Sequence, residues 1–392
     1  MKQSEKMSLP NGWLMKTVGD VCLRGSSNVS QNQLENEVGD YPIFGASGLI
    51  KNVSFYHQEK PYLSIVKDGS GFGRVTKMNA YTSVIGTLQY ILPKEDIDLN
   101  YLYYNLISID FKKYVQGAAI PHIYFKDYQN EPFLWMPLSE QQHIVAILDE
   151  AFAAIANAKA NAEQNLKNAK ELFESYLQGV FENKGEDWEE KTLKDVCAKI
   201  TDGTHQTPKY FDEGIIFLSS RNVTSGKIDW ENIKYIDEKQ HLEMHKRVAP
   251  RVGDILLAKN GTTGVAAMVD RDLVFDIYVS LAHIRVLDEI TPDFMLYFIN
   301  SPIAKKQFNK RLKGSGVPNL HLEEIREVEI SFPKSKKEQN KLVEKLNNFS
   351  NETKKLEDIY KQKISDLEEL KKSILQKAFS GELKTENKLA AV

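Results

Sequence analysis

The sequence reads SEQQHIVAILDEAFAAIANAKANAEQNLKNAKELFESYLQGVF at Ser139–Phe181 and KEQNKLVEKLNNFSNETKKLEDIYKQKISDLEELKKSILQKAF at Lys337–Phe379, and this repeated stretch decides the fold. The two copies are equal in length, so no residue has been gained or lost between their ends. A loop tolerates a change in length, whereas a packed helix that gains a residue turns its apolar side chains away from their partner. The repeat therefore predicts two long helices of equal length.

Apolar side chains in the second copy recur at alternating steps of four and three, a spacing typical of a coiled-coil seam. The predicted seam positions are Leu342, Leu346, Phe349, Thr353, Leu356, Tyr360, Lys363, Leu367, Leu370 and Ile374. Alanines fill the middle of the first copy, which lets a partner helix approach closely. Residues 139–185 carry an excess of acidic side chains and residues 335–392 an excess of basic ones. Equal length and opposite charge favour an antiparallel pair within one chain over two separate surface helices.

The composition is that of a globular protein with two or three domains, with 392 residues, 42% of them hydrophobic and 27% charged. No apolar run reaches the ~20 residues of a membrane span, and the first residues lack a signal-peptide core, so we expect a cytoplasmic protein. The net charge of −3 argues against tight non-specific DNA binding by the chain alone. Cys22 and Cys197 occupy equivalent places in the repeat and are expected to be small buried side chains.

The repeat extends beyond the long helices. The matching segments are Trp13 with Trp188, Asp20-Val21-Cys22 with Asp195-Val196-Cys197, Lys67-Asp68-Gly69 with Lys259-Asn260-Gly261, and Lys112-Lys113 with Lys305-Lys306. The difference in residue number between matching positions grows through these segments and stays constant through the helices. This pattern indicates two domains of variable length connected by helices of fixed length. We predict an α+β fold: domain 1 at residues 1–138, a helix at 139–185, domain 2 at 186–334, and a second helix with a tail at 335–392. The two helices would form an antiparallel coiled coil, giving the fold a pseudo-two-fold internal repeat.

Each domain is predicted to mix strands and helices. In domain 1, strands are expected at residues 62–66 and 74–77, on either side of a glycine-rich turn. In domain 2, the corresponding strands are expected at 254–258 and 265–269. Helices are expected at 99–115 and 292–312.

No motif for catalysis or metal binding is found in the sequence. Gly69-Ser70-Gly71 lacks the lysine–hydroxyl ending of a phosphate-binding loop and is better explained as a hairpin turn. His241 and His245 have helical spacing, but no glutamate follows in a zinc-protease pattern, so we predict no metal site. The chain contains no Pro-Pro pair, which an adenine methyltransferase motif would need. These absences favour a binding protein over a nuclease or methyltransferase.

Polar loops carry the best candidates for DNA contact, because Arg and Asn match base edges while Lys, Ser and Thr mostly contact phosphates. The candidates are Lys67, Ser70, Arg74 and Lys77 in domain 1, and Thr204, His205, Arg221, Asn222, Lys259, Asn260, Thr262 and Thr263 in domain 2. The alternative, that these are ordinary polar loop tips, stays open for each residue.

The arrangement resembles the specificity (S) subunits of type I restriction–modification systems over essentially the whole chain. Trp13 with Gly19-Asp20-Val21, and Trp188 with Leu193-Lys194-Asp195-Val196, resemble the openings of the two target-recognition domains of that family. Pro137-Leu138-Ser139-Glu140-Gln141 is similar to the start of its conserved helical region, and residues 370–383 resemble its final signature. The second helical start, at 333–339, is two residues longer than the first.

The resemblance implies a non-catalytic subunit that binds a bipartite double-stranded DNA site, one half per domain, as part of DNA methylation and restriction. The helices would dock two modification (methyltransferase) subunits, which carry S-adenosylmethionine and methylate adenine, and restriction subunits (endonuclease and translocase) would join the complex. No cofactor is expected in this chain. The residues expected to contact partners are Gln141, Ile144, Leu148, Leu177, Phe181, Gln339, Leu342, Leu375 and Phe379. The alternative is a coiled-coil scaffold with two protein-binding heads.

Overall fold

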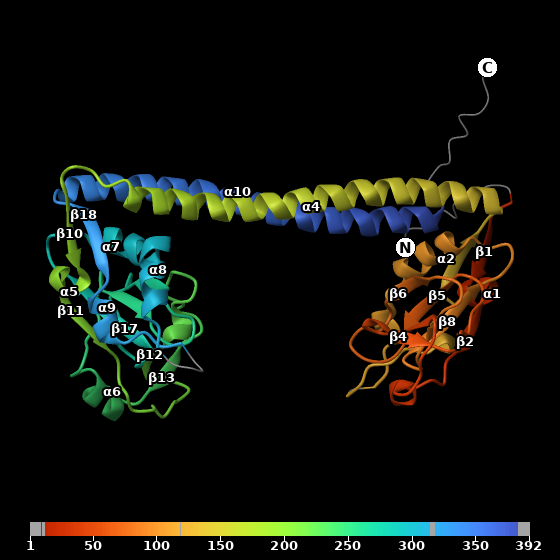
Figure 1. Cartoon of the computed structure of the whole chain (residues 1–392), viewed down its shortest axis with the longest axis horizontal. Helices are drawn as coiled ribbons and strands as arrows, with labels where there is room; N and C mark the ends of the chain where they lie inside the picture. The colour runs from red at the N-terminus through yellow and green to blue at the C-terminus, as the bar shows by residue number, and fades with distance from the viewer. Residues whose placement is uncertain (1–8, 10–11, 118, 314–317, 383–392) are drawn as a thin grey trace, which may run out of the picture. The chain divides into compact units, whose positions relative to one another are not determined.

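The computed structural model describes residues 9, 12–117, 119–313 and 318–382 (Figure 1). Leu383, the last residue of the C-terminal motif, lies outside these ranges. The chain forms two compact units: unit 1 comprises residues up to Ala162 and from Gln362 onward, and unit 2 comprises Glu163–Lys361. Two helices, α4 (Leu138–Glu182) and α10 (Lys336–Ser380), each have 45 residues and each contribute to both units. The prediction of two long helices of equal length is confirmed.

The globular part of unit 1 contains three sheets. Its strands are β1 (Leu14–Thr17), β2 (Cys22–Ser26), β3 (Tyr41–Gly45), β4 (Gly48–Val53), β5 (Tyr62–Val66), β6 (Val75–Met78), β7 (Ser83–Val84), β8 (Leu88–Pro93) and β9 (Pro132–Trp135). Its helices are α1 (Val18–Val21), η1 (Gln31–Leu34), α2 (Leu99–Ser108), η2 (Phe111–Tyr114) and α3 (Phe125–Tyr128). The sheet orders are β2-β8-β5-β6, β4-β3-β7 and β1-β9.

The globular part of unit 2 repeats this plan. Its strands are β10 (Trp188–Thr192), β11 (Cys197–Asp202), β12 (Ile215–Leu218), β13 (Lys234–Ile236), β14 (Ile255–Ala258), β15 (Ala266–Met268), β16 (Phe275–Ile277), β17 (Leu281–Val286) and β18 (Glu329–Pro333). Its helices are α5 (Leu193–Val196), η3 (Ser220–Asn222), α6 (Glu238–Met244), α7 (Pro292–Asn300), α8 (Pro302–Arg311) and α9 (Leu322–Arg326). The sheet orders β11-β17-β14-β15, β13-β12-β16 and β10-β18 match those of unit 1.

The predicted strands correspond to β5 and β6 in unit 1 and to β14 and β15 in unit 2, each an antiparallel pair. The predicted helices are shorter than expected. The first ends at Ser108 and is followed by the short η2 turn, which Asp110 caps. The second breaks at Ser301, because Pro302 disfavours a helical backbone in the residue before it and the Ser301 hydroxyl caps α8.

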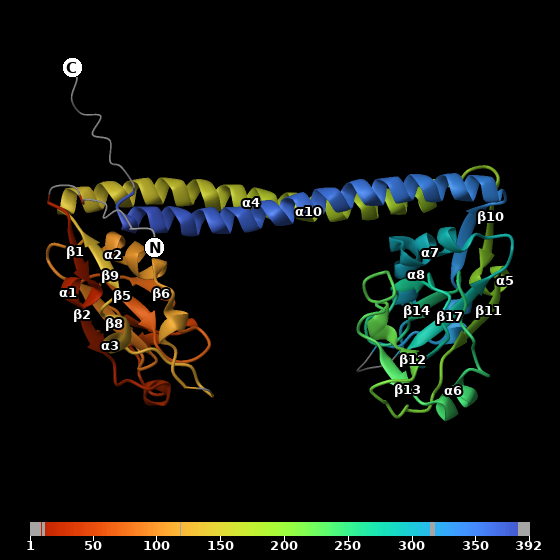
Figure 2. The same ribbon diagram turned by 180° about the vertical axis from the view of Figure 1, so that it is seen from behind.

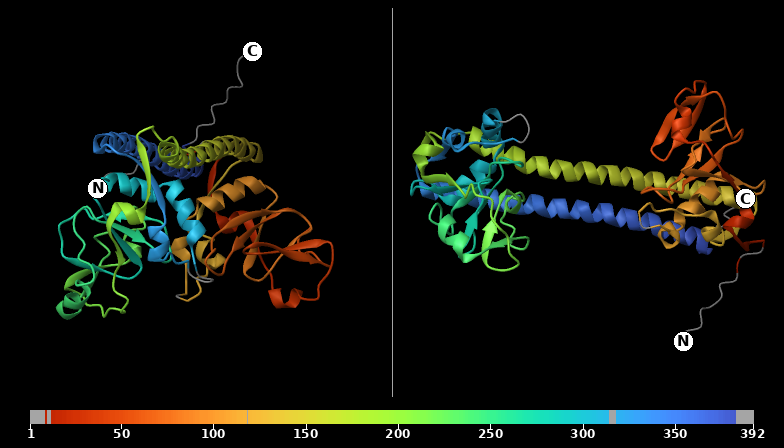
Figure 3. Two further views of the ribbon diagram at one scale, coloured as in Figure 1. Left: turned by 60° about the vertical axis from the view of Figure 1, so that its left-hand side comes forward. Right: turned by 90° about the horizontal axis from the view of Figure 1, so that it is seen from below.

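The long helices lie side by side and antiparallel (Figures 1 and 3). In unit 1, the first part of α4 meets the last part of α10, where Lys159 Nζ lies 2.6 Å from Glu368 Oε1. In unit 2, the last part of α4 meets the first part of α10, where the Tyr176 and Phe349 ring centroids are 4.5 Å apart. The predicted antiparallel coiled coil is confirmed.

The seam on α10 departs from the predicted one at several positions and keeps it at others, such as Phe349, which packs on Tyr176 of α4. Leu346, Thr353 and Leu367 point inward as predicted, but Leu356 and Leu370 are 39% and 47% exposed. Val343, Ile364 and Leu375 are more buried, and each lies one residue after a predicted position. Because an α-helix has 3.6 rather than 3.5 residues per turn, neighbouring rows compete for the seam, and the sequence alone did not rank them.

In each unit, one short helix of the globular part packs against the long helices. In unit 2, α7 lies between the sheet containing β17 and the long helices (Figure 2). Its Phe294 and Phe298 rings pack against Phe181 of α4, at centroid distances of 5.3 and 5.5 Å. In unit 1, Tyr104 of α2 packs on Phe152 of α4 at 5.4 Å. The hydrophobic core of each unit therefore continues from the sheet into the helix pair.

The two cysteines are free thiols. Cys22 is buried and Cys197 half-buried, and desolvation raises the pKa of both thiols to about 12. They remain protonated at neutral pH. The predicted burial is confirmed for Cys22 and only partly for Cys197. Among the described residues, no helix combines the length and the apolar character needed to cross a membrane.

Candidate nucleic-acid interface

The glycine-rich loop of unit 1 is held by backbone hydrogen bonds at the end of β5. The Lys67 N–H donates to the Thr87 carbonyl at 3.0 Å, and the Lys67 carbonyl accepts from the Ile123 N–H at 2.9 Å. The Gly69 N–H donates to the Pro121 carbonyl at 2.9 Å, with Gly69 at φ +92°. The side chains of this loop are therefore presented on a fixed backbone.

Unit 2 builds the same backbone framework from different residues. The Lys259 N–H donates to the Ser280 carbonyl at 2.9 Å, and its carbonyl accepts from the Leu320 N–H at 2.8 Å. The Gly261 N–H donates to the Pro318 carbonyl at 3.3 Å, with φ +75°. The two loops therefore share one backbone framework, while Asp68 in unit 1 is replaced by Asn260 in unit 2.

In unit 1, the predicted contact residues do not all share one surface. Ser70 and Arg74 are exposed beside the loop, and the Arg74 guanidinium donates to the Ala46 carbonyl. Lys67 is half-buried, with its ammonium 3.7 Å from Asp68 Oδ2. Lys77 points to α2, where its ammonium donates to Asn100 Oδ1 at 2.8 Å. Ser70 and Arg74 are thus the predicted residues that lie exposed at this loop.

In unit 2, the carboxylate of Asp202 links its own predicted loop to the predicted loop at Lys259 and to Arg247, which was not among the predicted residues. It accepts a hydrogen bond from the Arg247 guanidinium, and it lies 3.3 Å from Lys259 Nζ and 3.2 Å from His205 Nε2. Burial raises the pKa of this carboxyl, but hydrogen bonds from Arg247 and His205 and the charge of Lys259 more than offset it, so the pKa lies below its ordinary value. Asp202 is therefore ionised and links these side chains at neutral pH.

Three predicted contact residues of unit 2 need correction, because their side chains are buried. The buried ammonium of Lys259 forms an ion pair with Asp202. Asn222 accepts from the Ser219 N–H and donates to the Asn232 carbonyl, and Thr204 caps the following turn at Gln206. These buried side chains hold the loops in shape through their hydrogen bonds and ion pair.

The remaining predicted residues of unit 2 are accessible. His205, Arg221 and Thr262 are exposed, and Asn260 and Thr263 are half-buried. Ser280 ties their loops together, because its hydroxyl accepts from the Ser220 N–H at 3.0 Å while its carbonyl accepts from Lys259. The structure thus collects the loops containing residues 201–205, 219–222 and 259–264 around Ser280.

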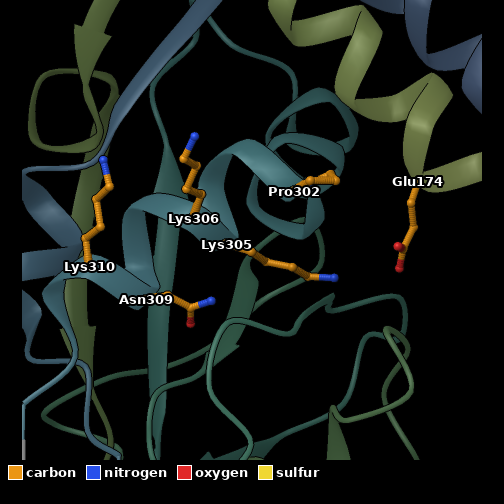
Figure 4. A pocket seen from close by; sticks show the side chains of 6 residues that line it. All are labelled: Glu174, Pro302, Lys305, Lys306, Asn309 and Lys310. Atoms are coloured by element: carbon orange, nitrogen blue, oxygen red, sulfur yellow. The ribbon is translucent and has the colours of Figure 1, made fainter. Parts of the chain in front are cut away.

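A basic helix beside this surface was not among the predicted contact residues. Lys305, Lys306 and Lys310 of α8 line a shallow hollow together with Glu174 of α4, and Lys305 extends toward Glu174 (Figure 4). Within the described part of the chain, none of these lysines has an ion-pair partner within 4.0 Å. An ideal Cβ on Gly264 would lie 3.9 Å from Lys305 Cγ, so the 259–264 loop adjoins α8.

Unit 1 has the same neighbourhood. Its loop residue Gly73, at φ +78°, packs so tightly on Phe111 of η2 that an added Cβ would lie 2.7 Å from the Phe111 Cβ. Lys112 and Lys113 follow Phe111 and are exposed. The matching of Lys112-Lys113 with Lys305-Lys306 in the sequence was the signal that could have identified these lysines.

The predicted partner-contact residues also need correction. Gln141, Ile144, Leu148, Leu177, Phe181, Gln339 and Leu375 are buried within their own units, and Leu342 and Phe379 are half-buried. Gln141 Nε2 donates to the Asp96 and Met136 carbonyls, and its Oε1 accepts from the Asp98 N–H. The buried side chains attach the helices to the domains and leave little surface for another subunit, whereas Leu342 and Phe379 remain partly exposed.

The helices nevertheless expose other apolar side chains. They include Leu172 and Tyr176 on α4 and Leu356, Ile359 and Leu370 on α10. Exposed leucine and isoleucine on a long helix are candidate contacts for a partner protein. They replace the buried residues as the candidate docking positions.

The comparisons with known proteins agree with this architecture. A family model described as "Type I restriction modification DNA specificity domain" matches twice, at residues 10–168 and 185–367. The type I restriction enzyme MjaVIII specificity subunit of Methanocaldococcus jannaschii is 25% identical over 98% of this chain and 96% of its own. The EcoBI specificity subunit of Escherichia coli is 23% identical over 68% of this chain and 61% of its own.

Two solved structures share the fold. A chain from a structure describing complex assembly and conformational transition of the type I R-M system aligns with a TM-score of 0.75, at 18% identity, over 95% of this chain and 98% of that one. The HsdS subunit from Thermoanaerobacter tengcongensis aligns with a TM-score of 0.58, at 17% identity, over 96% and 99%. With two matched domains that together span most of its length, the chain belongs to the type I restriction modification DNA specificity family.

Proposed function

We propose that this chain recognises a bipartite double-stranded DNA site, with one half-site read by the globular part of each unit. The observation that carries the proposal is the duplicated loop framework at Lys67–Gly69 and Lys259–Gly261, which keeps its backbone hydrogen bonds while the middle residue and the loop side chains that follow it differ. Shared backbone geometry with different Arg, Asn and Thr side chains suits two readers of different bases. The division into domains at 1–138 and 186–334, with helical segments at 139–185 and 335–392, belongs to this proposal.

In unit 1, the proposed reading residues are Ser70 and Arg74, with Lys112 and Lys113 contacting phosphates. In unit 2, they are His205, Arg221, Asn260, Thr262 and Thr263, with Lys305, Lys306 and Lys310 contacting phosphates. Lysine ammonium groups without protein partners suit phosphate contact, because they carry charge to the backbone without selecting a base. An overall negative chain can bind DNA through such local basic surfaces.

The chain itself supplies recognition and no reaction. It positions two modification subunits, which bind S-adenosylmethionine and methylate adenine, and restriction subunits in the assembled enzyme. The exposed side chains Leu172, Tyr176, Leu356, Ile359 and Leu370 are proposed to take part in docking these subunits. The protein would act in the cytoplasm, where its DNA target lies.

A library of duplexes with two randomised half-sites tests this function. The full chain, assembled with its modification subunits, should retain duplexes that share two separate sequence motifs. Arg74→Ala should relax selection at one motif and Arg221→Ala at the other, by about 1–3 kcal/mol of discrimination for a base-reading arginine. Lys345→Ala, an exposed change on α10, is the control and should leave both motifs unchanged. Retention without any shared motif would refute the proposal and favour a protein-binding scaffold.

A further inference from the structure

The histidine pair of unit 2 meets a third potential ligand that the sequence did not place near it. His241 Nδ1 lies 2.7 Å from Asp276 Oδ2, and His245 Nδ1 lies 3.0 Å from Asp276 Oδ1. One ligand atom from each of the three residues falls within 4.8 Å of the others. His241 is on α6 and His245 caps its C-terminus, whereas Asp276 is on β16.

The charge balance around Asp276 distinguishes it from the other buried aspartates. Asp202 has Arg247 and Lys259 as partners, and Asp254 has Arg285. In the described ranges, the Asp276 carboxylate pairs only with the two imidazoles, although its side chain is just 1% exposed. A buried carboxylate needs compensating charge. A divalent cation would provide that charge.

The donor set fits a transition-metal ion. Two imidazole nitrogens and one carboxylate oxygen are borderline ligands that Zn²⁺ accepts, and a three-ligand site leaves a fourth position for water. The i, i+4 spacing puts both rings on one side of α6, where their centroids are 4.6 Å apart. Their side chains are 15% and 31% exposed, which leaves a path from solvent to the carboxylate.

We propose that His241, His245 and Asp276 form a binding site for one divalent transition-metal ion, with zinc as the best match. The ion would fasten α6 to β16 at the end of unit 2 remote from the long helices (Figure 1). This position matters for the loops around Ser280, because Arg247 follows His245 by two residues and holds the Asp202 carboxylate. Metal binding would therefore order the segment that supports the Asp202 cluster.

Cobalt substitution tests the site without reference to DNA binding. The full-length chain, free of affinity tags and stripped with a chelator, is titrated with Co²⁺. One equivalent should bind with visible absorption bands of a nitrogen–oxygen site, and Zn²⁺ should bleach them. Asp276→Asn and the His241→Asn/His245→Asn double variant should lose the bands. His321→Asn, which removes an exposed imidazole of the same unit, should retain them.

A second measurement uses the unmutated chain, so that it stands even if a variant fails to fold. Zn²⁺ should protect His241 and His245 from carbethoxylation, read by peptide mass spectrometry, while His321 stays reactive. Absence of stoichiometric Co²⁺ uptake, uptake that survives in the folded site variants, or equal modification of all three histidines with and without Zn²⁺ would overturn the proposal. The cluster would then be a hydrogen-bonded anchor for α6.

Discussion

Gln339 accepts a hydrogen bond from the backbone N–H of Thr291 through its side-chain oxygen at 2.9 Å. Its Nε2 donates to the carbonyls of Glu289 at 2.9 Å and Pro333 at 2.8 Å. Gln141 makes three matching bonds in unit 1. One fully buried amide thus satisfies three backbone groups where each long helix begins, and this fixes the direction in which the helix leaves its domain.

Gln339→Ala should destabilise unit 2 by about 2–4 kcal/mol, since each buried group left without a partner costs roughly 1–3 kcal/mol and water can reach part of the gap. Urea titration followed by tryptophan fluorescence measures the change. Asn340→Ala alters the exposed neighbour and should cost less than about 0.5 kcal/mol. Equal midpoints for the two variants would show that the amide does not fasten the helix.

The sequence predicted the helix pair well because helix length and the constant offset of the repeat are global signals. It could not determine which of two adjacent rows on α10 faces inward. Leu356 and Leu370 fit the heptad as well as Val343 and Ala378 do, and only the packed structure separates them. The side chains left outside then become candidate partner contacts.

The corrected seam gives a direct comparison of two leucines on α10. Leu346 is fully buried and Leu356 is 39% exposed. Leu346→Ala should cost about 2–5 kcal/mol, because it removes apolar contacts and leaves a cavity, whereas Leu356→Ala should cost much less. Thermal unfolding of both variants measures this difference. If Leu356→Ala is the more damaging change in the isolated chain, the seam described for α10 is wrong.

The candidate site was predicted in part. The polar loops were located correctly because Gly69 and Gly261 mark their turns, but their side chains could not be sorted into exposed and buried ones. Lys259 illustrates the difficulty, since a lysine in a loop is usually exposed and only its distant partner Asp202 explains its burial. The pairing of His241 with Asp276, 35 residues apart, likewise depends on strand order.

The Asp254 network predicts how stability depends on pH. Burial raises the pKa of this carboxyl, but hydrogen bonds from Arg285, His283 and the Arg251 N–H outweigh burial, so the pKa lies well below its ordinary value. The folded state therefore binds a proton less readily than the unfolded state, and this stability is complete above about pH 5 and is lost as the pH falls below about 4.

Asp254→Asn should lower stability at neutral pH by on the order of 2–4 kcal/mol, because it leaves Arg285 without its charged partner. It should also flatten the fall of stability between about pH 5 and pH 3. Urea midpoints at a series of pH values measure both effects. Asp270→Asn, at an exposed position of the same unit, should keep the wild-type slope. A slope unchanged by Asp254→Asn would assign the acid sensitivity to other carboxyls.

The lysines of α8 should act on affinity rather than on sequence choice. Replacing both Lys305 and Lys306 with Ala should weaken binding to all duplexes alike. The slope of log K against the logarithm of the salt concentration should become less steep by up to about two. Lys345→Ala with Lys354→Ala on α10 removes the same charge at exposed positions and should leave the slope unchanged. Binding of both double variants, measured at several salt concentrations, gives the two slopes to be compared. A loss of selectivity at one motif would instead make these lysines base readers.

The long helices should set the number of unread base pairs between the half-sites. Deleting Asn161–Gln164 from α4 and Tyr360–Lys363 from α10 shortens each helix by ~6 Å. That length corresponds to one or two base pairs at ~3.4 Å each, and the removed turn of ~400° returns the following residues close to their original direction. The variant should keep both recognised motifs and prefer a gap that is shorter by one or two base pairs. Its affinity should fall, because ~400° exceeds a full turn by ~40° and the residues after each deletion are rotated by that amount. Duplexes of systematically varied gap report the preference.

The control for the deletion is Asn161→Ala with Gln164→Ala, two exposed changes that keep the helix length and should keep the original gap. A deletion variant that folds, binds both motifs and still prefers the original gap would show that helix length does not determine the spacing. Because the recognition loops lie wholly outside the deleted segments, a change in the recognised bases would contradict the proposal in a second way. The bases and the gap are therefore separable quantities, controlled by the loops and by the helices respectively.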